Sequence, residues 1–269
     1  MSNKTAIYKE FGIEYKAGKI LSTVGWIHEL MINGNSKIGN GVYHFSTLPG
    51  NKEYKVTING QEYETTGTCA DLCTGCYGTK GNYRFSNTIN NIGVRNVIAR
   101  EYMNFCELAI MAQIKADNIK TVRIHATGDF FSRDYLEMWK RIIKANPATV
   151  FWTYTKETAA ETAFDELENA NIVKSNVPMI ESGSETNGYN YGHCDYIMAL
   201  YDFLKSMGKS VYICRCGIDK NQHCTNCTAC AKCENVLFIE HSTGYKAEKD
   251  PLYNEIVKLI ESQYKSFIQ

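Results

Sequence analysis

The feature that most constrains the fold is a repeated alternation of short strand-like segments with longer helix-like segments. Strands that alternate with helices predict a parallel sheet covered by helices. We therefore predict an α/β fold, namely a partial (βα)6 barrel with parallel strands. Its six strands are the runs rich in β-branched and aromatic residues at 41–48, 121–126, 148–154, 176–182, 210–216 and 235–241.

Two segments interrupt this alternation. A hairpin at 53–66, with Asn59-Gly60 at its tip, is predicted to be an insertion after the first strand. After the fifth strand a cysteine-rich loop, 214–233, replaces the expected helix. The predicted organisation is an N-terminal extension (1–40), the barrel (41–241) and a C-terminal helical segment (242–269) that packs on the barrel.

Composition narrows the functional classes. The 29 basic and 29 acidic residues balance, so no global charge favours nucleic acid or an anionic membrane. The first residues lack the apolar core of a signal peptide, and no apolar run is long enough to span a bilayer. We therefore expect a cytoplasmic protein without a membrane partner, in which the 11 cysteines serve metals more readily than disulfides.

The first cysteine group lies in the stretch TCADLCTGCYG. Cys69, Cys73 and Cys76 have the spacing C-x3-C-x2-C. Three thiolates can hold three irons of a [4Fe–4S] cluster and leave the fourth iron open to a small molecule. The alternative is a zinc site in which the fourth ligand is Cys106, Cys194 or a histidine.

The C-x3-C-x2-C spacing, placed after the first strand of an alternating pattern, resembles the radical S-adenosylmethionine (SAM) superfamily. The stretches CYG (76–78) and TGDF (127–130) also resemble a group of phage-encoded proteins related to that superfamily. The resemblance implies that a [4Fe–4S] cluster cleaves SAM and that the resulting 5′-deoxyadenosyl radical takes hydrogen from an unknown substrate. It also implies an external one-electron donor of the flavodoxin or ferredoxin type.

The same resemblance suggests which residues contact SAM. The second strand ends in HATGDFF, where Gly128 permits close backbone approach and the Asp129 carboxylate can accept a hydrogen bond from an ammonium group. TGDF could equally be a plain strand-to-helix turn in which Asp129 or Ser132 caps the next helix. The sequence departs from the superfamily at Gly75, where an aromatic residue is usual. The candidate SAM contacts are Tyr77, Thr127, Gly128, Asp129, Ser182 and Ser184.

The second cysteine group has ferredoxin-like spacing. Its final run, C-x2-C-x2-C-x2-C, favours an auxiliary [4Fe–4S] cluster, for a total of at least two clusters. A zinc site with His223 as an added ligand is the alternative, and a non-enzymatic iron–sulfur or zinc protein for electron transfer or nucleic-acid binding is the alternative function. The candidate ligands are Cys214, Cys216, Cys224, Cys227, Cys230 and Cys233.

Overall fold

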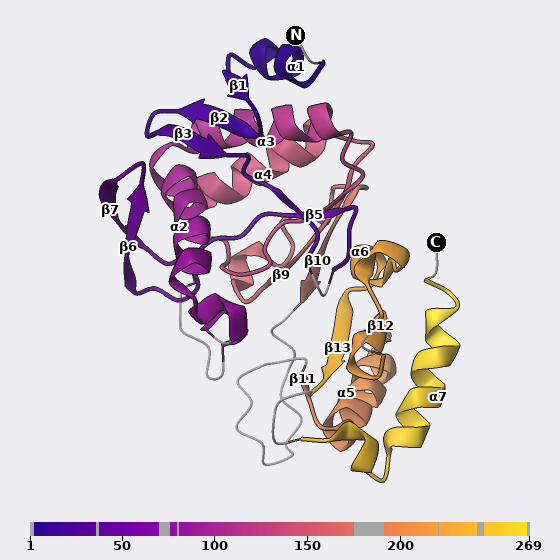
Figure 1. Cartoon of the computed structure of the whole chain (residues 1–269). Coiled ribbons are helices and arrows are strands. Elements are labelled where there is room, and N and C mark those ends of the chain that lie inside the picture. The colour runs from indigo at the N-terminus through magenta and orange to yellow at the C-terminus, as the bar shows by residue number, and fades with distance from the viewer. Residues whose placement is uncertain are drawn as a thin grey trace. The chain divides into compact units, whose positions relative to one another are not determined.

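The computed structural model describes residues 3–35, 38–69, 76–79, 81–174, 191–219, 221–240 and 245–267. The chain divides into two compact units (Figure 1). Unit 1 comprises Met1–Gly34, Gly41–Phe151 and Ala163–Ala170, and unit 2 comprises Asn35–Asn40, Trp152–Thr162 and Asn171–Gln269.

Unit 1 holds four helices and eight strands within its described residues, together with the first residues of two further strands. The helices are α1 (Asn3–Glu10), α2 (Ser86–Glu101), α3 (Met103–Asp117) and α4 (Arg133–Ala145). The strands are β1 (Tyr15–Lys16), β2 (Lys19–Ser22), β3 (Gly25–His28), β4 (Ile32–Asn33), β5 (Val42–His44), β6 (Glu53–Ile58), β7 (Gln61–Thr66) and β8 (Thr121–Arg123). The further strands are β9 (Val150–Thr155) and β10 (Ala170–Lys174).

The sheets of unit 1 are small and mostly antiparallel. Strands β1, β2 and β3 form an antiparallel meander, and β6 pairs with β7 in the hairpin that the sequence predicted. Its tip residues Asn59 and Gly60 both have positive φ angles, of 51° and 84°, as a two-residue type I′ turn requires. Strand β5 pairs in parallel with β8 on one side and antiparallel with β4 on the other.

The core of unit 1 is built where α4 covers the sheet. Ser132 caps α4, because its hydroxyl accepts a hydrogen bond from the Tyr135 N–H at 3.1 Å. One face of the helix then buries a continuous apolar stripe, and Trp139 meets the ring of Phe45 edge-on, with ring centroids 5.6 Å apart. The stripe consists of Tyr135, Met138, Trp139, Ile142 and Ile143.

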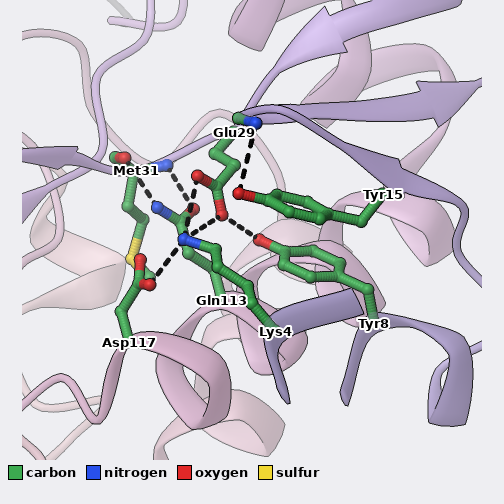
Figure 2. Close-up of polar contacts among 8 residues, drawn as sticks. Lys4, Tyr8, Tyr15, Glu29, Met31, Gln113 and Asp117 are labelled. Carbon is green, nitrogen blue, oxygen red and sulfur yellow. Dashed lines mark hydrogen bonds and ion pairs between the residues drawn. The ribbon is translucent and has the colours of Figure 1, made fainter. Parts of the chain in front are cut away.

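The N-terminal residues are joined to α3 by a polar network (Figure 2). The Lys4 ammonium lies 2.5 Å from an Asp117 carboxylate oxygen and 2.9 Å from a Glu29 oxygen, and the Tyr8 hydroxyl donates to Glu29 at 2.6 Å. Burial lowers the pKa of Lys4, but its hydrogen bonds to Asp117 and Glu29 outweigh burial and raise it overall. The Gln113 side chain adds two bonds of 2.9 Å to the Met31 backbone.

Unit 2 is a three-stranded parallel sheet packed against helices. Strand β13 (Asn235–Ile239) lies between β11 (Tyr191–Gly192) and β12 (Val211–Ile213), and both pairings are parallel. The helices are α5 (Cys194–Ser206), the single turn α6 (Ala229–Lys232) and α7 (Tyr253–Tyr264). A buried cluster that includes Ile197, Leu200, Leu237, Ile256 and Ile260 joins α5 and α7 to the sheet.

The predicted partial (βα)6 barrel is wrong. The described residues form a mixed α/β structure with four small sheets and no closed barrel. The physical reason lies in residues 1–40, whose structure the sequence left open. They supply β1 to β4, and the antiparallel β4 occupies the edge of β5, where barrel closure would need a parallel strand. The fourth predicted strand, 176–182, lies outside the described residues.

No helix within the described ranges combines the length and apolar character needed to cross a membrane.

Candidate functional site

In unit 1 the TGDF turn lies against the residues just before the first cysteine. The Thr127 hydroxyl donates to the Thr47 carbonyl oxygen at 2.9 Å, and the Thr47 N–H donates back to the Thr127 carbonyl at 3.1 Å. The Thr68 hydroxyl donates to the Leu48 carbonyl at 3.1 Å, so it accepts from the Thr47 hydroxyl at 2.7 Å and from the Asp129 N–H at 3.0 Å. The two strand ends are therefore joined by a continuous set of buried hydrogen bonds.

Glycine is required at the centre of this turn. Gly128 has a φ angle of +83°, which L residues rarely adopt. A Cβ atom at this position would lie 1.9 Å from the Thr47 hydroxyl oxygen and 2.6 Å from the Thr68 hydroxyl oxygen. Gly78, after the last cysteine of the first group, is less confined, because its Cβ would lie 3.0 Å from Pro49 and 3.2 Å from Thr127, which are tight contacts and not clashes.

The structure distinguishes the two candidate caps of α4. Ser132 caps the helix, whereas Asp129 is buried in the turn and accepts a hydrogen bond from the Phe130 N–H at 2.8 Å. His125 does not line an open site. It is buried beside Tyr135, 3.0 Å from the Tyr135 hydroxyl, and burial lowers its pKa to about 3.

The described part of the first cysteine group brings Cys69 and Cys76 to the same side of unit 1. The Cys69 N–H donates to the Gly50 carbonyl, and the Cys76 carbonyl accepts from the Thr79 hydroxyl at 2.8 Å. Burial and the nearby Cys69 and Cys76 thiols raise the pKa of Tyr54 to about 12. Tyr77 opens the short 3-10 helix η1 (Tyr77–Thr79). Cys73, Ser182 and Ser184 lie outside the described residues.

In unit 2 the second cysteine group brings thiols together from two short stretches. Cys214 directly follows β12, where its N–H donates to the Leu237 carbonyl at 2.8 Å, and Cys216 lies in the next element, the 3-10 helix η4 (Arg215–Gly217). The Cys214 thiol donates to the Cys216 sulfur at an Sγ–Sγ distance of 3.2 Å. That hydrogen bond, followed by burial and the Cys216 and Cys230 thiols, raises the pKa of Cys214 well above its ordinary value.

Cys227 and Cys230 form the second stretch. Burial raises the pKa of the Cys227 thiol, and the charge of Cys216 adds to the shift. The Cys230 sulfur lies 2.8 Å from the Tyr154 hydroxyl. The Asn171 amide donates to the carbonyls of Cys230 and Cys233, both at 2.8 Å, and so fixes the α6 turn that carries the cysteines.

The remaining two cysteines of the group are Cys233 and Cys224. Cys233 is 3% exposed and belongs to the buried cluster against which Cys214, Cys227 and Cys230 pack, and burial followed by the nearby Cys227 raises its pKa to about 11. The Cys224 carbonyl accepts from the Cys227 N–H at 3.0 Å and closes the 3-10 turn before it.

Over the described ranges, no group of three or more histidine, cysteine, aspartate or glutamate side chains has the arrangement of a metal site. The Cys214–Cys216 pair and its neighbours are therefore a set of thiols and not a formed coordination sphere.

Several residues of these sites were missed by sequence reasoning. Thr47 and Thr68 carry the hydrogen bonds around Gly128, and Asn171 holds the α6 turn. Single threonines and asparagines next to strands give no signal in one sequence, because the same residues occur in ordinary strand ends and turns.

Comparison with known proteins identifies the family to which the chain belongs. The family model described as GP88, Gene product 88, matches residues 35–236, which is most of the chain and includes both cysteine groups. The chain belongs to the Gene product 88 family. The Gene 88 protein of Mycobacterium phage L5 is 32% identical over 134 residues, which cover 44% of this chain and 54% of the relative. The chain thus spans about half the length of this relative. No solved structure matches the chain.

Family membership corrects the resemblance drawn from the cysteine spacing. The assignment to the radical SAM superfamily, or to phage-encoded proteins related to it, is wrong, because the matching family is a phage gene-product family. The descriptions that depended on it, as a radical SAM protein and an iron–sulfur protein with an auxiliary cluster, are wrong with it. Cleavage of SAM, the [4Fe–4S] clusters and the external electron donor stay untested predictions.

Proposed function

We propose that this protein is a zinc-binding, non-enzymatic protein in which Cys214, Cys216, Cys227 and Cys230 bind one metal ion. The observation that carries the proposal is that Cys214 lies beside Cys216 and packs, together with Cys227 and Cys230, against one buried cluster of unit 2, although the thiols are not arranged as a formed metal site. Cys214 and Cys216 are 3.2 Å apart, the pKa of Cys214 responds to Cys230, and the pKa of Cys227 responds to Cys216. Four thiolates are the ligand set of a closed structural zinc site.

The sulfur separation favours one metal ion over a cubane cluster. Zinc–sulfur bonds of about 2.3 Å in a tetrahedron place neighbouring sulfurs about 3.8 Å apart. The Cys214 and Cys216 sulfurs lie 3.2 Å apart in a thiol–thiol hydrogen bond and would need to separate by about 0.6 Å to reach that edge. In a [4Fe–4S] cube each cysteine binds a different iron, so the sulfurs lie farther apart. A pair this close therefore suits two bonds to the same ion.

The surroundings of the thiols also fit a metal that organises the segment. Tyr154 can donate a hydrogen bond to the Cys230 sulfur, and Asn171 fixes the backbone of the same turn. Such outer contacts orient thiolate ligands and spread their negative charge. Beneath them lies the apolar cluster that contains Tyr212 and Cys233. A zinc ion would join the residues that follow β12 to the single turn α6, within a connection between β12 and β13 whose described helices are all short.

Zinc has no redox chemistry, and four protein ligands leave it no open position for a substrate. The proposed role of the metal is therefore structural. It supports a binding function for the protein more readily than electron transfer or catalysis.

Metal analysis of matched variants tests the proposal. Full-length protein is produced with both zinc and iron in the medium, purified anaerobically without chelators, and its metals are measured by mass spectrometry. We expect one zinc per chain in the natural protein and in Cys224→Ser, which alters the same segment outside the four ligands. Cys216→Ser and Cys227→Ser are expected to lose the metal, because a serine hydroxyl is a poor zinc ligand.

Two results would contradict the proposal. Iron in place of zinc would show that the site holds a different centre. Zinc that persists in Cys216→Ser and Cys227→Ser would show that the metal lies elsewhere in the chain.

A further inference from the structure

We infer that unit 1 contains a binding site for a nucleoside monophosphate, in the cavity between the segment after β5 and the start of α2. The cavity has a volume of about 240 Å³. It lies beside the first cysteine group without using its thiols, and it is independent of the zinc proposal.

The floor of the cavity is apolar. Leu48 and Ile92 are 1% and 6% exposed, and Pro49 and Ile89 lie beside them on the cavity wall. The position of Pro49 is fixed from behind, since its carbonyl accepts the Tyr54 hydroxyl at 2.8 Å. A wall of this kind favours the flat face of an aromatic ring, because burying apolar surface on both sides excludes water.

The charged lining residues of the cavity are both basic. Lys52 and Arg84 are exposed at its edge, and the described cavity wall includes no carboxylate. Within the described residues neither side chain forms an ion pair, and the contact that Lys52 makes with the Tyr54 ring leaves its charge unneutralised for an anion. An arginine fork together with a lysine point charge is the usual partner set for phosphate.

Two tyrosines complete the wall and favour an aromatic ligand over a bare anion. Tyr54 and Tyr83 both line the cavity, and the Lys52 ammonium lies 5.0 Å from the centre of the Tyr54 ring. Tyr54 is neutral at pH 7 like any tyrosine, and burial followed by the Cys69 and Cys76 thiols raises its pKa further, to about 12. It therefore adds a stacking surface without a negative charge that would repel phosphate.

The size of the cavity limits the ligand to one nucleotide. Pockets for drug-sized ligands and cofactors have volumes of about 300–1,000 Å³, and this one is smaller at about 240 Å³. A dinucleotide would exceed it. Gly78 and Thr79 close the side next to the cysteines, and a Cβ atom at Gly78 would make a tight contact of 3.0 Å with Pro49.

Calorimetric titration of full-length protein tests this inference. The probes are the four ribonucleoside monophosphates, adenosine without phosphate, and inorganic phosphate. We expect at least one monophosphate to bind, with adenosine and inorganic phosphate each about tenfold weaker or more. Lys52→Ala and Arg84→Ala should each weaken that monophosphate about tenfold, the loss of one charge-assisted hydrogen bond of about 1.5 kcal/mol. Both variants should leave adenosine binding unchanged.

The matched control is Lys16→Ala, which removes an exposed lysine of β1 outside the cavity and should leave all affinities unchanged. The inference is overturned if no monophosphate binds at millimolar concentration, or if inorganic phosphate alone binds as tightly. It is also overturned if Lys16→Ala weakens binding as much as Lys52→Ala. An oligonucleotide that binds far more tightly than any monophosphate would overturn the restriction to a single nucleotide.

Discussion

Replacing Gly128 by alanine should destabilise unit 1 more than the same replacement at a glycine that has a similar φ angle but open space around it. Alanine at a φ angle of +83° carries a conformational cost of about 1–2 kcal/mol. The added Cβ would also lie 1.9 Å from the Thr47 hydroxyl oxygen, and such overpacking costs about 1–3 kcal/mol. We therefore expect Gly128→Ala to lower the free energy of unfolding by about 2–5 kcal/mol.

Gly18→Ala is the matched control. Gly18 lies in unit 1 with a φ angle of +79°, and a Cβ there would meet nothing within 4 Å. Its expected cost is the conformational one alone, about 1–2 kcal/mol. Urea unfolding followed by circular dichroism measures both variants. If Gly128→Ala is no more destabilising than Gly18→Ala, the packing of the turn against Thr47 and Thr68 is incorrect.

Three further measurements follow from other contacts. Glu29→Ala should lower the free energy of unfolding in urea by about 1–3 kcal/mol, because it leaves the Tyr8 hydroxyl without its acceptor and leaves Lys4 with Asp117 alone. Glu62→Ala, which removes an exposed ion pair, should cost under about 1 kcal/mol, and equal losses would contradict the network. The folded-state pKa of His125 is depressed to about 3, so the neutral His125 contributes fully to the free energy of unfolding above pH 6.5. That contribution falls by about 1.4 kcal/mol per pH unit as the pH drops from 6.5 towards 3. His125→Gln should flatten this pH dependence in acid titrations, and an unchanged slope would contradict the burial of His125 as the neutral form. Asn171→Ala should weaken zinc binding about tenfold in competition with a chromophoric chelator, and an unchanged affinity would remove Asn171 from the support of the site.

Local structure was predictable where the signal lies in neighbouring residues. The hairpin tip at Asn59-Gly60 is found where the sequence placed it, and Ser132, one of the two candidate caps, caps the helix that follows. Turn chemistry and helical periodicity act over a few residues, so one sequence contains the information.

The sheet arrangement was not predictable in the same way. The segments at 41–48 and 121–126 do contain parallel neighbours, β5 and β8. Periodicity does not show which strands pair with β5, or that β4 occupies one of its edges, because strand pairing depends on contacts between residues distant in sequence. The alternation of strands and helices was therefore read as one sheet, when the segments belong to several.

The candidate sites were also predictable only where the signal lies in neighbouring residues. Gly128 was predicted to allow close backbone approach to SAM, which stays a prediction, and the groups that the structure places beside it are hydroxyls of the protein. The six cysteines of the second group were identified by spacing alone. Spacing does not distinguish the buried Cys233 from Cys230, which are three residues apart, because the difference comes from what α6 packs against.

The coordination of the metal tests the central claim most directly. Zinc X-ray absorption of the purified full-length protein reports the number and type of ligands. The proposal predicts four sulfur ligands at about 2.3 Å, with loss of the signal in Cys216→Ser and its retention in Cys224→Ser. Protein without zinc, or a zinc ion bound by nitrogen and oxygen atoms, would contradict a four-thiolate centre at Cys214, Cys216, Cys227 and Cys230.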